Sequence, residues 1–197
     1  MLQYLKSDDS GKLTIRENLV KGSWIRCERP NEEEISQLLS LGIDADIITD
    51  ALDPHEVPRL DADNERTYLI ARLPDTDDDF NDFTTPILFV IHADYIITIS
   101  RDSLGRLWQP FIDKHVASTS SRIALLVDMI DALATQYQRR VAAINRQMRA
   151  ATGDIRTLRA RDIATLAEYE RKLNDYMDAL VRSEEHTSEL QSLGAIS

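Results

Sequence analysis

The sequence predicts an α/β fold, in which a mixed β-sheet packs with helices and is followed by a long antiparallel helical hairpin. Short runs of β-branched and aromatic residues, separated by turn-forming residues, fill much of the first hundred positions. Two stretches with apolar residues at helical spacing interrupt these runs. After Ser121 the chain contains no proline, and apolar residues recur every three or four positions.

Three short strands are expected first, at residues 2–6, 13–16 and 24–27. Turn signals that include Gly11 and Gly22 separate them. Cys27 is the only cysteine, so no intramolecular disulfide can form and a reducing compartment is favoured. Because it lies on the third strand, we expect a half-buried structural thiol.

Two short helices should follow. Three glutamates after Asn31 place negative charge in a first helical turn, and the apolar positions behind them have helical spacing. The second helix covers residues 44–53 and ends at Pro54, because proline cannot continue the hydrogen-bond ladder of a helix.

The remaining strands are expected at residues 67–73, 86–91 and 95–100. An acidic stretch between the first two resembles a calcium-binding loop only in composition. Such a loop needs glycine where Phe80 stands and glutamate where Pro86 stands, so a solvated hairpin loop is favoured. The acidic residues are Asp75, Asp77, Asp78, Asp79 and Asp82.

The last part of the chain predicts two long helices joined near Gly153. Each arm would be roughly 40 to 48 Å long, which is more than a small domain needs, and long arms usually contact other subunits. We therefore divide the chain into an α/β domain at 1–118, a helical hairpin at 119–181 and a tail at 182–197. The two apolar stripes are Ile123, Leu126, Ile130, Leu133, Tyr137, Val141, Ile144 and Met148, then Ile155, Leu158, Leu166, Tyr169, Leu173, Tyr176 and Leu180.

Composition and motifs exclude several classes of function. A net charge of −11 repels phosphate backbones, so nucleic acid is not an expected partner. The longest aliphatic run, at 87–91, is far short of the ~20 apolar residues that span a bilayer, and the chain as written is expected to be soluble. No phosphate-binding loop, nucleophile elbow or zinc-protease motif occurs, so an enzyme is not expected. His55, His92 and His115 have no metal-ligand spacing.

An acidic corner at residues 41–59 is the best candidate site. Asp46, Asp50 and Asp53 are about one helical turn apart, so their carboxylates could hold a hydrated divalent ion. An ordinary solvated helix face is the alternative, and spacing alone favours it. The residues alone do not decide between an ion-binding site and a solvated helix face.

An ordered series of segments resembles the CorA family of magnesium transporters, over about Met1 to Leu180. No segment is specific to the family by itself, but the order and spacing of the segments together are specific. The segments are Trp24-Ile25, Leu41-Gly42-Ile43 and the corner to Pro58-Arg59, Tyr68-Leu69-Ile70, Thr84-Thr85-Pro86-Ile87-Leu88-Phe89-Val90, Tyr95-Ile96-Ile97-Thr98-Ile99, and Leu125-Leu126-Val127-Asp128-Met129-Ile130-Asp131-Ala132-Leu133.

The resemblance implies the cytoplasmic part of a cell-membrane transporter that assembles as a homopentamer. A stalk helix, two membrane helices and a Gly-Met-Asn pore signature would follow this region. Mg²⁺ would be both the transported ion and a regulator that binds between subunits and keeps the pore closed, with Co²⁺ or Ni²⁺ as further candidate ions. Matching by residue places regulatory metal ligands at Asp50 and Asp131, whereas Thr49 replaces an acidic residue of some relatives.

The tail at 182–197 resembles the translation of a sequencing-library adapter, so we expect it to be foreign to the natural protein. Membrane helices would then be missing because the reading frame ran off the native sequence. Two other readings stay open. The chain could be a stand-alone soluble helical interaction protein, or a metal-dependent hydrolase that uses the carboxylates of residues 44–56, although no nucleophile or general base accompanies them.

Overall fold

The computed structural model describes residues 1–76, 82–113, 118–151 and 167–177. Within these residues, seven strands form one sheet in the order β2-β1-β3-β7-β6-β5-β4. The strands are β1 (Leu2–Ser7), β2 (Leu13–Arg16), β3 (Ser23–Glu28), β4 (Arg59–Ala62), β5 (Arg66–Thr76), β6 (Asp82–His92) and β7 (Tyr95–Ser100). The helices are α1 (Glu32–Ser40), α2 (Ala45–Leu52), α3 (Gly105–Asp113) and α4 (Arg122–Ala151).

The sheet is mixed, as the sequence predicts. Strands β2, β1 and β3 form one antiparallel group, and β4 to β7 form another. The two groups join through the parallel pair of β3 and β7, which runs from Ser23 opposite Tyr95 to Glu28 opposite Ser100. The predicted hairpin around the acidic stretch is confirmed, because β5 and β6 pair antiparallel up to Thr76 and Asp82.

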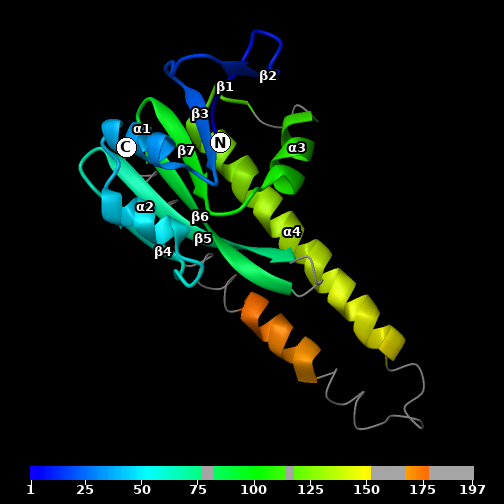
Figure 1. Cartoon of the computed structure of the whole chain (residues 1–197). Helices are drawn as coiled ribbons and strands as arrows, with labels where there is room; N and C mark the ends of the chain where they lie inside the picture. Colours follow the sequence, from blue (N-terminus) through cyan, green and yellow to red (C-terminus); the bar gives the residue numbers. More distant parts are fainter. Residues whose placement is uncertain (77–81, 114–117, 152–166, 178–197) are drawn as a thin grey trace.

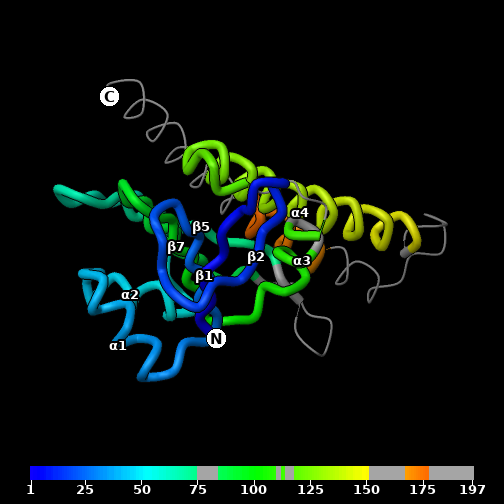
Figure 2. The backbone as a smooth tube through the Cα atoms, turned by 90° about the horizontal axis from the view of Figure 1, so that it is seen from above, coloured from blue at the N-terminus to red at the C-terminus, as the bar shows by residue number. Residues whose placement is uncertain are grey.

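Helices cover both faces of the sheet, and each face has its own apolar core (Figures 1 and 2). Side chains of successive strand residues point to opposite faces, so Leu69 packs with α3 and α4 whereas Ile70 packs with α1 and α2. The same alternation separates Trp24 from Ile25 on β3. The acidic corner therefore lies on one side of the sheet and the long helix on the other.

The sequence signal at the start of α1 is confirmed. Asn31 is the N-cap residue, and a reciprocal capping box with Glu34 satisfies two backbone N–H groups. After the helix, Gly42 adopts φ +80°, and a β-carbon there would lie 2.8 Å from Nη2 of Arg66. Arg66 uses that nitrogen to donate to the Leu41 carbonyl oxygen at 2.9 Å, which ties the turn before α2 to the sheet.

Two elements were not predicted, namely α3 and the short edge strand β4. Pro110 and Gly105 both argue against a helix locally, but α3 buries Trp108 completely. The Trp108 and Trp24 rings meet edge to face with centroids 5.2 Å apart. Burial of Leu107 and Trp108 in the core on this face of the sheet outweighs the weak helical propensity of the segment.

The first arm of the predicted hairpin is α4, a helix of 30 residues that is about 45 Å long at 1.5 Å per residue. Residues 167–177 are also helical and lie beside it (Figure 1). Tyr137 and Tyr176 pack edge to face at 5.8 Å, and Ile144 is buried in the same cluster. The predicted turn near Gly153, His115 and the tail at 182–197 lie outside the described residues.

Candidate functional site

The acidic corner is built on α2, whose inner face is anchored in the core. Ile48 and Ala51 are buried, and Asp44 caps the helix by accepting a hydrogen bond from the backbone N–H of Asp46 at 2.7 Å. Asp50 lies beside this buried face, and about a third of its side chain is exposed. The helix thus holds a carboxylate at the edge of the core, where water and ions can reach it.

Asp50 forms an ion pair within the chain with Arg59, the first residue of β4. Nη2 of Arg59 donates to Oδ2 of Asp50 at 2.5 Å, Nε donates to Oδ2 of Asp61 at 2.7 Å, and Nη1 donates to Oε1 of Glu56. Burial alone would lower the pKa of the Arg59 guanidinium, but hydrogen bonds to Asp50 and Asp61 and the charge of Glu56 raise it above its ordinary value. Every nitrogen of this side chain faces a carboxylate.

The exit of the corner is held by a second arginine, Arg72 on β5. Its Nη2 donates to the Pro54 carbonyl oxygen at 2.9 Å, and Nη1 donates to the Glu56 carbonyl oxygen. Nε donates to the Thr84 hydroxyl at 2.7 Å. The segment that carries Glu56 is therefore fixed to strands β5 and β6.

The backbone of Arg72 also connects to the opposite face of the sheet. Arg72 is registered opposite Pro86, which has no N–H to donate. The hydroxyl of Tyr137 on α4 donates to the Arg72 carbonyl oxygen at 3.0 Å. One residue of the sheet thus contacts both the acidic corner and the long helix.

Asp131, the second predicted metal ligand, is exposed on α4. Asp128 lies one turn earlier on the same helix, and burial together with the charge of Asp131 raises the pKa of Asp128 above its ordinary value. Sequence reasoning singled out Asp131 alone. The i, i+3 spacing of the two aspartates was the available signal for the pair.

The structure does not bring the predicted site residues together. Asp50 belongs to α2 and Asp131 to α4. These two helices cover opposite faces of the sheet (Figure 1). In the part of the chain that the structure describes, no three His, Cys, Asp or Glu side chains gather as a metal-ion site within one subunit would need. The grouping of Asp46, Asp50 and Asp53, which spacing alone did not favour, is not found among the described residues, and Asp53 accepts a hydrogen bond from the backbone N–H of His55.

Cys27 is a structural residue. It is fully buried on β3 rather than half-buried, and burial raises the pKa of its thiol to about 12. His92 stacks on Tyr95 with ring centroids 4.4 Å apart, and its Nδ1 accepts a hydrogen bond from the backbone N–H of Asp94. Neither group is arranged as a metal ligand.

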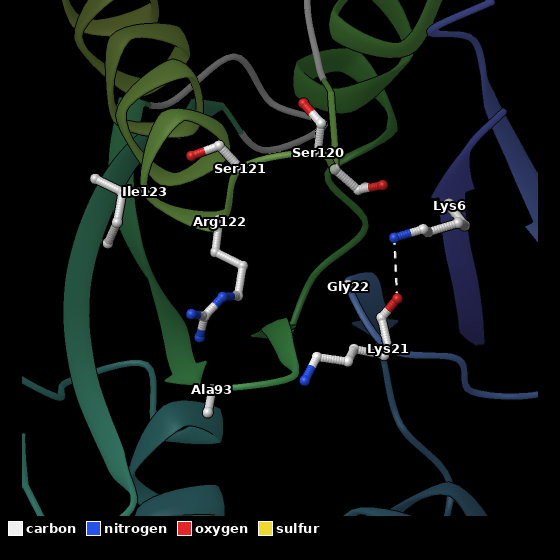
Figure 3. A pocket seen from close by; sticks show the side chains of 9 residues that line it. Lys6, Lys21, Gly22, Ala93, Ser120, Ser121, Arg122 and Ile123 are labelled. Carbon is white, nitrogen blue, oxygen red and sulfur yellow. Dashed lines mark hydrogen bonds between the residues drawn. The ribbon is translucent and has the colours of Figure 1, made fainter. Parts of the chain in front are cut away.

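An open pocket of about 670 Å³ lies where the start of α4 meets β1 and the β6–β7 turn (Figure 3). Lys6, Lys21 and Arg122 line it, and Lys6 donates to the Lys21 carbonyl oxygen at 2.9 Å. Lys21 pairs with Asp94 at 2.9 Å. Three cationic side chains repel a divalent cation, so this pocket does not compete with the acidic corner as a candidate metal site.

None of the helices that the structure describes has the length and apolar character that crossing a membrane requires.

Comparisons with known structures show the fold. The structure of the complete CorA magnesium transporter from Methanocaldococcus jannaschii matches with a TM-score of 0.81 at 17% identity, and the match covers 96% of this chain and 62% of that one. The soluble domain of the same transporter matches with a TM-score of 0.75 at 16% identity, covering 94% of this chain and 77% of the other. The ZntB cytoplasmic domain from Vibrio parahaemolyticus RIMD 2210633 gives 0.73 at 14% identity, with coverages of 95% and 78%.

A search of curated proteins finds no match. The family profile described as "CorA-like Mg2+ transporter protein" matches residues 21–194, and so runs into the tail at 182–197, whose foreign origin stays a prediction. The fold, the mixed sheet with its long helix and this match over most of the sequence lead to one conclusion: the chain belongs to the CorA-like Mg²⁺ transporter family.

Proposed function

We propose that this chain is the cytoplasmic regulatory part of a CorA-type Mg²⁺ transporter of the cell membrane. Mg²⁺ binds between neighbouring subunits of a homopentamer and favours the closed state of a pore formed by residues outside this chain. Falling Mg²⁺ then releases the subunits and favours opening by mass action. The proposal assigns no catalysis to this chain, and family membership is the observation that carries it.

Asp50 is the proposed ligand at the corner. Mg²⁺ retains several water molecules and is usually held by one or two carboxylates, so a single exposed carboxylate per subunit is a chemically sufficient contribution. Asp50 fits this role because about a third of its side chain is exposed, while α2 fixes its position. A neighbouring subunit would supply the remaining ligands, which agrees with the absence of a three-ligand group in the described residues.

Asp131 is the proposed ligand on the second face. It follows two exposed apolar residues of α4 at four-residue intervals, Ile123 (61% exposed) and Val127 (55% exposed). Residues at i, i+4 and i+8 share one helix face, so Asp131 extends an apolar stripe that another subunit can cover. Burial and the charge of Asp131 both raise the pKa of Asp128, and a divalent cation here would relieve the second of these effects.

Substitution of Asp50 in the full-length transporter tests the proposal. In D50N the Mg²⁺ concentration that half-protects the cytoplasmic region from proteolysis should rise about tenfold, because an amide cannot supply the lost charge. D46N is the matched control, since Asp46 lies one turn away on α2 and is exposed. Unchanged protection in D50N would contradict the assignment of Asp50.

The proposal that the pore is formed by residues outside this chain has its own test, which is to sequence the gene past Leu180 from primers within this reading frame. A reading frame that simply ended at Ser197 would contradict that part of the proposal.

A further inference from the structure

We propose that Arg59 is a built-in competitor of the divalent ion: it occupies the Asp50 carboxylate when Mg²⁺ is absent, and so sets the Mg²⁺ concentration to which the corner responds. The inference rests on the proposed function of Asp50 and adds a regulatory residue to that site. Its basis is the way in which one guanidinium group is shared among three carboxylates.

The three carboxylates approach Arg59 from three segments, and each uses a different nitrogen. Asp50 comes from α2 and accepts from Nη2, Glu56 comes from the turn after α2 and accepts from Nη1, and Asp61 comes from β4 and accepts from Nε. The side chains of Asp50 and Asp61 are 35% and 48% exposed, whereas that of Glu56 is 13% exposed. Arg59 is therefore held most deeply on the Glu56 side and meets water on the Asp50 side.

Arg59 and a divalent ion cannot share Asp50 without cost. The Oδ2 atom that accepts from Nη2 lies 2.5 Å from that nitrogen, so an ion bound to the same oxygen would lie within a few ångströms of a positive charge. The guanidinium stays protonated at every physiological pH, so loss of a proton cannot relieve the repulsion. Binding of the ion at this oxygen requires Arg59 to withdraw.

Arg59 can move away from Asp50 because it has two other carboxylate partners, Glu56 and Asp61. Moving away from Asp50 breaks one ion pair and leaves those with Glu56 and Asp61 in place. Glu56 does not follow, since the Arg72 guanidinium holds its carbonyl oxygen. The exchange thus replaces one partly exposed ion pair by a metal contact, and such a pair contributes little in water. A weak internal competitor lowers the apparent affinity of the site without blocking it.

The test is an Mg²⁺ titration of the full-length transporter at constant ionic strength, with half-protection from proteolysis as the readout. R59Q should lower the half-protecting concentration about fivefold, because the competing charge is gone. R59K retains the charge and should stay closer to the wild type. R16Q is the matched control: it removes one positive charge from an exposed position on β2, and should leave the titration unchanged.

The double variant D50N/R59Q separates this inference from the proposed function. If D50N weakens protection and R59Q strengthens it only when Asp50 is present, Arg59 acts through Asp50 as proposed. If D50N weakens protection while R59Q changes nothing, the role of Arg59 is overturned and that of Asp50 stands. If D50N itself changes nothing, the proposed function fails first.

A structural readout covers the case in which R59Q folds poorly. A structure of the wild-type transporter with Mg²⁺ bound at the corner should show Nη2 of Arg59 out of hydrogen-bonding distance of Oδ2 of Asp50. Retention of that hydrogen bond beside a bound ion would overturn the proposal whatever the behaviour of the variant.

Discussion

The carboxylates on the two faces of the sheet have different neighbours: on one face they pair with an arginine, and on the other they lie next to each other. At the corner, Asp50, Glu56 and Asp61 share one arginine, so each carboxylate has a cationic partner although that partner carries only one positive charge. On α4, Asp128 and Asp131 lie one turn apart without such a cation in common among the residues that the structure describes, and burial together with the charge of Asp131 raises the pKa of Asp128. An added cation must displace a partner at the corner, whereas on α4 it would relieve repulsion. Carboxylates with the same chemistry thus acquire different responses to ions from their neighbours.

The largest expected effect comes from breaking the support of the corner. R72M removes the donors to the Pro54, Glu56 and Thr84 oxygens, and should lower the free energy of unfolding by about 3 kcal/mol, because partly buried acceptors lose charged partners. Urea denaturation of the 197-residue chain measures this. R101M, at an exposed position, should change it by less than about 0.5 kcal/mol. Equal losses in the two variants would show that Arg72 does not brace the corner.

A smaller effect is expected where the two faces meet. Y137F removes the hydroxyl that donates to the Arg72 carbonyl oxygen and keeps the aromatic ring, so stability should fall by about 1 kcal/mol. Y4F provides the comparison, since the Tyr4 hydroxyl makes no hydrogen bond among the described residues. Equal denaturation midpoints for Y137F and the wild type would contradict a stabilising hydrogen bond between α4 and Arg72.

The smallest effect has the opposite sign. The folded-state pKa of Asp128 is raised, so its protonated form is favoured in the folded protein, and that advantage is lost as pH rises through the folded-state pKa. D128N should therefore stabilise the protein at pH 7 by about 0.3 kcal/mol, the scale of like-charge pairs on a helix. At pH 3, below the unfolded pKa of about 3.9, the gain should vanish. E17Q, at an exposed position, removes the same charge and is the control for net charge.

Much of the fold was predictable because its signals are local. The three glutamates after Asn31, Pro54 after α2 and the alternating strands are signals that act within a few residues, and each is confirmed at about the expected position. The segment that forms α3 was missed because its local residues oppose a helix, and the burial of Leu107 and Trp108 in the core, with Trp108 against Trp24, explains it. β4 was missed because four residues after Pro58 are too short a signal and need β5 to pair with.

The candidate site shows the same division. Asp50 and Asp131 could be named from the sequence, because the resemblance to a family is detected from the order and spacing of segments along the chain. Their surroundings could not, since Arg59 lies nine residues beyond Asp50 and reaches it only after the chain has turned at Pro54 and entered β4. The neighbours of Asp131 depend on how α4 rotates to bury Leu125 and Met129.

The sequence by itself therefore determined the class of the fold, the order of most elements and the family, because periodicity, caps and motif order are properties of the linear chain. Only the tertiary structure decided that Asp50 is paired with an arginine, that Asp131 lies on the opposite face, and that Arg72 contacts both sides of the sheet. These facts depend on contacts between distant residues, and distance in space is fixed only when the sheet has formed and both cores are packed.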